Sequence, residues 1–197
     1  PYCQICGDPQ ARLNQHSTCS RCADARPVYR TLRSWAVFDQ GVQGAIHQLK
    51  YRKNIGLGRK LALLLKRLFK HDHLDIDLIV PVPLGEKRKQ ERGYNQAMLI
   101  ARPLAYMLGI PVSGSAMQRT RETKSQVGLT IDERHNNVSG AFLADAEQVS
   151  GNNILIVDDV TTTGATISAC ASALAVQAAA DIHGLTFARA LRISNAA

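Results

Sequence analysis

The distribution of apolar residues along the chain predicts its main structural elements. Two uninterrupted apolar runs, residues 78–82 and 154–157, offer no polar face, so we expect both to form buried parallel strands. Segment 59–70 spaces its leucines on one face of a helix, and an alanine-rich helical pattern extends from Ile167 to about Ala180. Strands followed by helices indicate an α/β domain.

Weaker patterns predict the connecting elements. We expect short strands at 35–38 and 110–112 and a last strand at 181–189, with helices at 46–51, 96–108 and 130–137. Pro103 should kink the helix that contains it. Residues 25–33 read as a polar connector, and the glycines at 41, 44, 56 and 58 as turns or loops. The 197 residues suit one α/β domain plus a small appendage.

Two acids follow the second apolar run directly. Asp158 and Asp159 lie where a parallel strand leaves its sheet, which is where open α/β sheets bind ligands. The threonine- and glycine-rich turn 161–166 then opens the alanine-rich helix, and backbone amides at such a helix start hold anions. The acids would repel a phosphate, so they should face hydrogen-bond donors or a cation. A sugar phosphate satisfies both demands, although a buried strand with an ordinary capped helix is the simpler alternative.

A basic cluster follows the apolar run 78–82. Residues 85–92 include Arg88 and Arg92, just past Pro83, and should therefore lie at the same sheet edge as the two acids. This placement favours a second anion pocket over plain surface charge. The net charge of +8, or +6 if four thiolates bind one zinc ion, suits a polyanionic ligand, either a small pyrophosphate or nucleic acid. No P-loop sequence occurs in the chain, which argues against a nucleotide hydrolase.

The N-terminal region carries two Cys-x2-Cys pairs, which predict a metal site. The pairs can present four thiolates to one tetrahedral ion, and residues 1–26 therefore form a candidate zinc finger with the ligands Cys3, Cys6, Cys19 and Cys22. Two disulfides are the alternative, disfavoured by the lack of a secretion signal. His16 is expected to be a bystander, and Cys170 a small core residue.

Segment 118–126 contains no apolar residue, and we expect an exposed loop there. Such a loop between core elements can act as a lid over a ligand, or it can be a mobile hairpin tip. The longest aliphatic run, 61–65, is far too short to span a bilayer, so we expect no membrane insertion. We also expect a cytoplasmic protein, because no charged, apolar and cleavable leader is present.

The run 153–166 resembles the phosphoribosyl-pyrophosphate (PRPP) signature of type I phosphoribosyltransferases: four hydrophobics, two acids and a Thr-Gly loop. Nearly the whole chain resembles the ComF family (ComFC/GntX-like). The further marks of that resemblance are the paired cysteine motifs, Leu49-Lys50-Tyr51, Val80-Pro81-Val82-Pro83, Arg88, Arg92-Gly93, Asn95-Gln96, Arg119-x-Arg121-x-Thr123-x-x-Gln126, Arg134-x-x-Asn137 and Gly140-Ala141-Phe142. One departure is Gly85, which follows Leu84 where the family often has a histidine after Val-Pro-x-Pro.

The resemblance implies a type I phosphoribosyltransferase fold, a parallel sheet flanked by helices, across residues 27–197, with a small N-terminal zinc finger that has four cysteine ligands. It also implies a link to natural transformation or use of external DNA, and a DNA translocase as a candidate partner. Segment 27–72 is the candidate hood that selects the acceptor.

The resemblance also assigns roles to individual residues. Asp158 and Asp159 would bind the ribose hydroxyls, and Arg88 and Arg92 the pyrophosphate with Mg²⁺. Arg119, Arg121 and Lys124 would close on the leaving group; with the two acids, Arg119 and Arg121 are the candidate catalytic residues. The remaining candidate PRPP-binding residues are Thr161, Thr162, Thr163, Gly164, Ala165, Thr166 and Gly85.

Two other readings stay open at this point. The chain can be a non-catalytic module that senses PRPP or a nucleotide and docks a partner or single-stranded DNA. It can also be a degenerate fold without ligand or turnover. The acceptor and the oligomeric state have no signal in the sequence.

Overall fold

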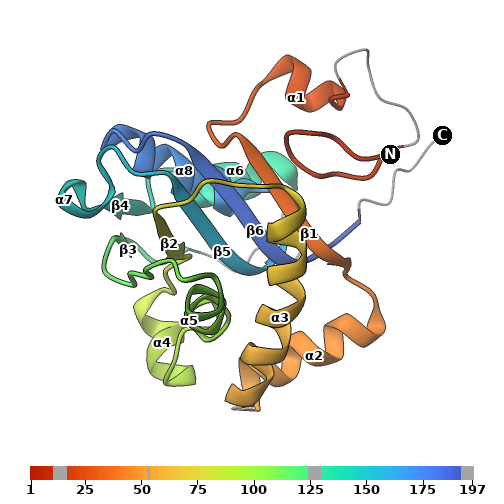
Figure 1. Ribbon diagram of the computed structural model, residues 1–197, viewed down its shortest axis with the longest axis vertical. Helices are drawn as coiled ribbons and strands as arrows, with labels where there is room; N and C mark the ends of the chain where they lie inside the picture. Colours follow the sequence, from red (N-terminus) through yellow and green to blue (C-terminus); the bar gives the residue numbers. More distant parts are fainter. Residues whose placement is uncertain (11–16, 53, 124–129, 192–197) are drawn as a thin grey trace.

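A four-stranded parallel sheet forms the centre of the molecule (Figure 1). The computed structural model describes residues 1–10, 17–52, 54–123 and 130–191. The strands lie in the order β1-β6-β5-β2. Their bounds are Thr31–Val37 for β1, Leu78–Pro81 for β2, Ile154–Thr161 for β5 and Ile182–Arg189 for β6.

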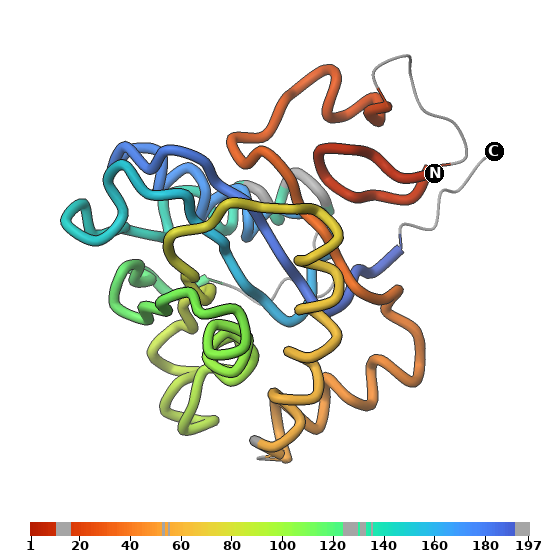
Figure 2. The backbone as a smooth tube through the Cα atoms, viewed as in Figure 1, coloured from red at the N-terminus to blue at the C-terminus, as the bar shows by residue number. Residues whose placement is uncertain are grey.

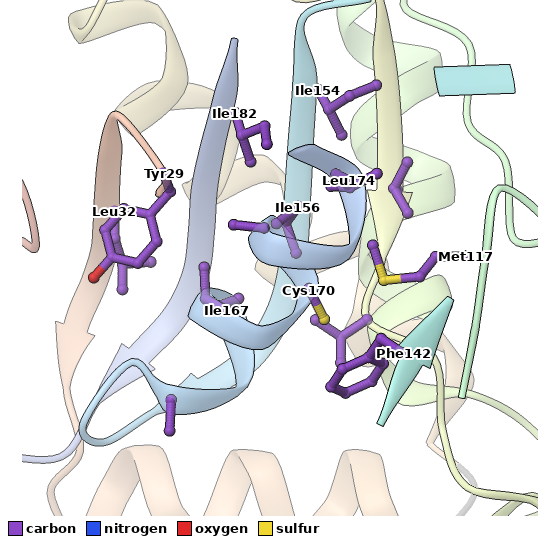
Figure 3. Close-up of a cluster of buried hydrophobic side chains, with 14 of the residues drawn as sticks. Tyr29, Leu32, Met117, Phe142, Ile154, Ile156, Ile167, Cys170, Leu174 and Ile182 are labelled. Atoms are coloured by element: carbon purple, nitrogen blue, oxygen red, sulfur yellow. The ribbon is translucent and has the colours of Figure 1, made fainter. Parts of the chain in front are cut away.

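Helices cover both faces of this sheet. On one face α2 (Gln40–Tyr51), α3 (Ile55–His71) and α5 (Gln96–Leu108) pack against Leu155 and Val157 of β5. On the other face α8 (Ala165–Val176) packs against Ile154 and Ile156, as Figure 3 shows for Cys170 and Leu174. Because neighbouring residues of β5 point to opposite faces, both faces need apolar side chains, which explains the uninterrupted apolar run.

Smaller elements complete the fold. The strands β3 (Met117–Arg119) and β4 (Phe142–Ala144) pair antiparallel, and β4 lies against α8. The short helices are α1 (Ser20–Asp24), α4 (Glu86–Arg92), α6 (Ile131–Val138) and α7 (Ala146–Val149). Figure 2 traces the N-terminal segment, in red, from outside the sheet into β1. This segment is attached to the sheet edge, because the Leu32 amide of β1 donates to the Ile5 carbonyl at 2.7 Å.

Several predicted boundaries were wrong, and packing explains them. Strand β1 begins at Thr31, inside the expected connector, because β6 offers it a parallel partner from His183 onward. Gly41 and Gly44 lie within α2, whose start is capped by the Asp39 side chain. Gly58 lies within α3 and permits contact with α5: a Cβ there would stand 2.4 Å from the Leu99 carbonyl oxygen.

The signature strand is longer than expected. Strand β5 includes both acids and ends at Thr161, because β6 continues alongside it as far as Arg189. Helix α8 begins at Ala165 and ends at Val176, short of Ala180. The basic cluster is itself the helix α4, and Pro103 lies within α5. The expected strand at 110–112 is reduced to a bridge between Val112 and Ile79.

The predicted fold class is confirmed: a parallel sheet flanked by helices, with an N-terminal cysteine cluster. Within the described residues, no helix combines the length and apolar character needed to cross a membrane. The expected loop 118–126 begins within β3, and its residues 124–126, including Lys124, lie outside the described part of the chain, as does His16.

Candidate functional site: a phosphate-loop pocket and a four-cysteine cluster

A cavity of about 490 Å³ opens at the carboxyl ends of the parallel strands. Its wall includes strand β5 and the loop that follows it, the segment after β2 and helix α2. The predicted site residues that line it are Asp158, Asp159, Thr161, Thr162, Gly164, Ala165, Thr166, Arg88, Arg92 and Arg119. The other lining residues are Phe38, Lys50, Tyr51, Val82, Pro83, Leu84, Gln96, Thr123, Arg134, Val160, Ile167 and Ala190.

The two acids are buried side by side, and one of them pairs with a lysine. The Lys50 ammonium lies 2.7 Å from Oδ2 of Asp159, and Oδ1 of Asp158 accepts the backbone N–H of Asp159 at 2.8 Å. Burial raises the pKa of Asp158 well above its ordinary value, and the charge of Asp159 raises it further. Burial also acts to raise the pKa of Asp159, but Lys50 and the Asp158 side chain outweigh this effect, so that pKa is lowered. These directions favour a proton on Asp158 over one on Asp159, and a negative charge on Asp159 that Lys50 compensates.

The loop after β5 presents small residues and backbone groups to the cavity. Gly164 has a φ of +85°, a left-handed conformation that favours glycine, and it directly precedes α8. Thr162 accepts a hydrogen bond from the Arg134 guanidinium at 2.8 Å. Thr163 does not line the cavity; its hydroxyl accepts the Ala165 amide at 3.2 Å, and its carbonyl accepts from Arg21 at 3.3 Å. A left-handed glycine directly before a helix is a feature of loops whose backbone amides surround an anion, and the predicted anion cradle stays a prediction.

A cationic wall faces this loop. Arg92 donates to the Gln96 side chain at 2.9 Å and lies over the Tyr51 ring, 5.0 Å from its centre. Arg88 also lines the cavity, in the first turn of α4. The two acids, the loop and the two arginines therefore line one cavity, and anion binding by the loop and the arginines stays a prediction.

The remaining predicted residues differ in placement. Arg119 lines the cavity and stacks over the Phe142 ring at 5.3 Å; burial, followed by the charge of Arg88, lowers its pKa. Arg121 is exposed, lies outside the cavity lining and donates to the Ser139 carbonyl at 2.7 Å. Gly85 also lies outside the lining, and a Cβ there would stand 2.6 Å from the Glu122 carboxylate. Arg121 and Gly85 therefore lie apart from the other predicted site residues, and the roles of all these residues stay predictions.

Sequence reasoning missed the part of Lys50, Tyr51 and Arg134 in this cavity. Lys50 and Tyr51 end α2 in the candidate hood segment, and Arg134 belongs to α6. All three fall in motifs that marked the family resemblance. Those motifs were the available signal, but nothing in their spacing shows that Lys50 reaches Asp159.

The four N-terminal cysteines form a compact buried cluster. Their sulfur atoms all lie within 4.8 Å of one another, and those of Cys6 and Cys19 are 3.8 Å apart. This separation is too long for a disulfide and matches the edge of a tetrahedron with metal–sulfur bonds of about 2.3 Å. All four thiols are free and buried. The donor set therefore fits a structural metal ion with no open coordination position.

The fold and the cavity define a phosphoribosyltransferase domain. The model of the phosphoribosyl transferase domain family matches residues 94–192. The fold is similar to that of glutamine PRPP amidotransferase from Bacillus subtilis, with a TM-score of 0.50 and 17% identity. That similarity covers 72% of this chain but only 30% of the amidotransferase.

Curated proteins define the family more closely. The chain is 32% identical to the DNA utilization protein YhgH of Escherichia coli over 96% of its own length and 84% of the relative. It is 30% identical to competence protein F of Haemophilus influenzae, covering 96% of this chain and 85% of that protein. Competence protein ComFC of B. subtilis is 27% identical, over 95% of this chain and 77% of ComFC. The chain belongs to the ComF family of phosphoribosyltransferase-like proteins.

Proposed function

We propose that the cavity binds PRPP and that the protein transfers its phosphoribosyl group in the use of external DNA. The observation that carries the proposal is the meeting, in one cavity, of a phosphate loop, two buried acids and an arginine wall. PRPP has the matching parts: a 5′-phosphate, ribose hydroxyls and a pyrophosphate. The names of the relatives, which refer to DNA utilization and competence, support the cellular role.

Each part of PRPP has a partner of suitable chemistry. The 5′-phosphate would take the amides and hydroxyls of 161–166, and the ribose hydroxyls would donate to Asp158 and Asp159. Arg88 and Arg92 would neutralise the pyrophosphate. Lys50 also lines the cavity, but it is paired with Asp159. Its charge therefore compensates Asp159 and is not assigned to the pyrophosphate.

Two metal ions complete the proposal. Mg²⁺ prefers oxygen ligands, which oxygens of PRPP and the carboxyl groups of Asp158 and Asp159 would provide, and the ion would offset pyrophosphate charge. Zn²⁺ fits the four thiolates of the N-terminal cluster, where its role would be structural.

The reaction would exchange one bond at the ribose. The bond between C1 and pyrophosphate breaks, its electron pair leaves on the pyrophosphate, and an acceptor atom bonds to C1 and gives up a proton. Arg119, which lines the cavity, would add positive charge beside the leaving group. Phe38, Lys50 and Tyr51 bring the candidate hood 27–72 to the cavity, where the acceptor would bind. A DNA translocase inside the cell is the partner that this role suggests.

Calorimetry with PRPP and Mg²⁺ tests the site. We expect wild type to bind, and Asp158→Ala and Asp159→Ala each to weaken binding about 30-fold or more, since each variant removes a buried carboxyl partner of the ribose hydroxyls. The control is Asp75→Ala, an exposed acid that does not line the cavity. Absence of heat with wild type, or unchanged affinity in both variants, would contradict the assignment. Release of pyrophosphate in a screen of bases and nucleic acids then shows transfer.

A second candidate function is a binding module that responds to PRPP without turnover. It is favoured by a second hollow of about 720 Å³, which shares Pro83, Leu84 and Arg119 with the first. Arg59, Lys89 and Arg102 add positive charge to its lining, so it suits an anionic partner such as single-stranded DNA. PRPP binding with no pyrophosphate release, and DNA affinity that falls steeply with salt, would favour this function.

A further inference from the structure

The carbonyl of Thr163 connects the phosphate loop to the cysteine cluster. Among the loop residues 161–166, Thr163 is the one that does not line the cavity. Its carbonyl accepts a hydrogen bond from Nη1 of Arg21 at 3.3 Å, from a residue 142 positions earlier in the chain. The loop is thus anchored from behind by the N-terminal segment.

Arg21 also contacts the metal-ligating side of that segment. It lies in α1, between Cys19 and Cys22, and its Nη2 lies 3.8 Å from the sulfur of Cys6. Nη2 also lies 3.9 Å from the Asp8 carboxylate. One guanidinium therefore spans a candidate zinc ligand and the phosphate loop, which its planar fork of N–H groups makes feasible.

A second arginine fixes the cluster to the sheet. Arg189, at the end of β6, is 3% exposed, donates to the Cys6 carbonyl and lies 3.6 Å from Asp8. Its backbone is in register with Thr161, the last residue of β5 before the loop. The cysteine cluster is therefore attached to the strand end beside the loop as well as to the loop itself.

The hydrogen bond from Arg21 also fixes the orientation of the peptide group between Thr163 and Gly164. In a trans peptide the C=O and the following N–H point in opposite directions, and the described chain has no cis peptide. Arg21 holds the Thr163 carbonyl toward the cysteine cluster, so the Gly164 N–H points the other way, and Gly164 lines the cavity. Tyr29 lies close to the same glycine, since a Cβ on Gly164 would lie 3.3 Å from its hydroxyl oxygen.

We propose that Arg21 is a positioning residue that couples metal occupancy of the cysteine cluster to the phosphate loop. With zinc bound, Arg21 presents the Gly164 amide to the ligand; without zinc, α1 loosens and the loop loses its anchor. Zinc and the phosphate-bearing ligand then bind with positive coupling, although neither contacts the other. The affinity part of this inference rests on the proposed PRPP site.

Amide hydrogen exchange without any ligand tests the anchor independently of PRPP. In Arg21→Ala we expect the peptide covering 161–168 to exchange about three- to tenfold faster than in wild type, with zinc content retained. Zinc removal from wild type by a chelator should have the same effect on that peptide. The matched control is Arg30→Ala, which removes an exposed ion pair with Asp181. Unchanged exchange in Arg21→Ala overturns the proposal.

Arg21→Lys keeps the test decisive if the alanine variant loses zinc. Lysine keeps a cation beside Cys6 and Asp8 but has no fork to reach Thr163 at the same time. We expect it to retain zinc and still show faster exchange at 161–168. If both variants lose zinc, Arg21 supports only the cluster, and the coupling is overturned.

Reciprocal binding is the final test. Saturating PRPP with Mg²⁺ should slow the release of zinc to a chelator in wild type and in Arg30→Ala, but not in Arg21→Ala. Equal slowing in all three proteins overturns the coupling. If wild type binds no PRPP, the proposed function fails, and the exchange result alone decides the role of Arg21.

Discussion

The cysteine cluster and the ligand cavity are built in opposite ways. The cluster consists of four buried cysteines, all of which come from residues 3–22. The cavity instead collects its charged residues from α2, α4, β3, α6 and the end of β5. A site made within one short segment is encoded by local spacing, whereas a site made by the tertiary fold depends on every element that positions a residue.

The two sites also balance charge differently. The four buried cysteines would need a bound metal ion to offset the charge of their thiolates. In the cavity, Lys50 compensates the charge of Asp159 within the protein, and burial favours the protonated form of Asp158. The cluster should therefore depend strongly on metal for stability, and the cavity on individual side chains for function.

Removal of one cysteine should have the largest effect. In Cys6→Ser the cluster loses a ligand, and we expect loss of zinc and a fall in the thermal midpoint of about 10 °C. The control Cys170→Ala changes a buried cysteine outside the cluster and should retain zinc. Zinc content and thermal unfolding measure both effects. Full zinc content in Cys6→Ser would mean that the cluster differs less from the cavity than we infer.

Lys50→Met should have the second largest effect and sharpen the contrast in charge balance. It leaves the buried Asp159 without its cation, so we expect a loss of about 2 kcal/mol in unfolding free energy at neutral pH. The lowered pKa of Asp159 means that its contribution is present above the unfolded value of 3.8 and disappears as pH falls through the folded pKa. The difference between variant and wild type should therefore shrink in acid. Lys70→Met, on an exposed position of α3, is the control for denaturant unfolding. A pH-independent difference would argue against the ion pair as its cause.

Asp158→Asn should have the smallest effect and the opposite sign. Because the pKa of Asp158 is raised in the folded state, the carboxyl favours folding in acid and opposes it as pH rises through the folded pKa. The amide removes this penalty, and we expect a gain of about 1 kcal/mol at neutral pH that vanishes below the unfolded pKa of 3.8. Denaturant unfolding across pH measures the gain. A loss of stability at neutral pH would contradict this expectation and show that the Asp158 carboxyl stabilises the fold.

The sequence predicted the parts of this protein that are local. The cysteine ligands, the strand 154–157 and the loop 161–166 each depend on neighbours in the chain, and the structure places them as a cluster, a strand and a loop lining the cavity. The ion pair of Lys50 with Asp159 was not predicted, because it depends on how α2 is placed relative to the end of β5. The sequence predicts a loop at Gly58, whereas this glycine lies in α3 and permits close contact with the Leu99 carbonyl. That contact depends on the packing of α3 against α5, which local sequence does not show.

The edges of the sheet give the N-terminal segment one more consequence. A strand edge with unpaired N–H and C=O groups is a template for another chain. The β2 edge is covered by residues 111–113, whose backbone bonds both sides of Ile79, while at the β1 edge the Leu32 amide is covered by Ile5. Ile5 lies between Cys3 and Cys6. A cysteine pair of the candidate metal site therefore also positions the residue that covers an amide of an edge strand, and a metal-depleted chain is expected to aggregate before it loses its core.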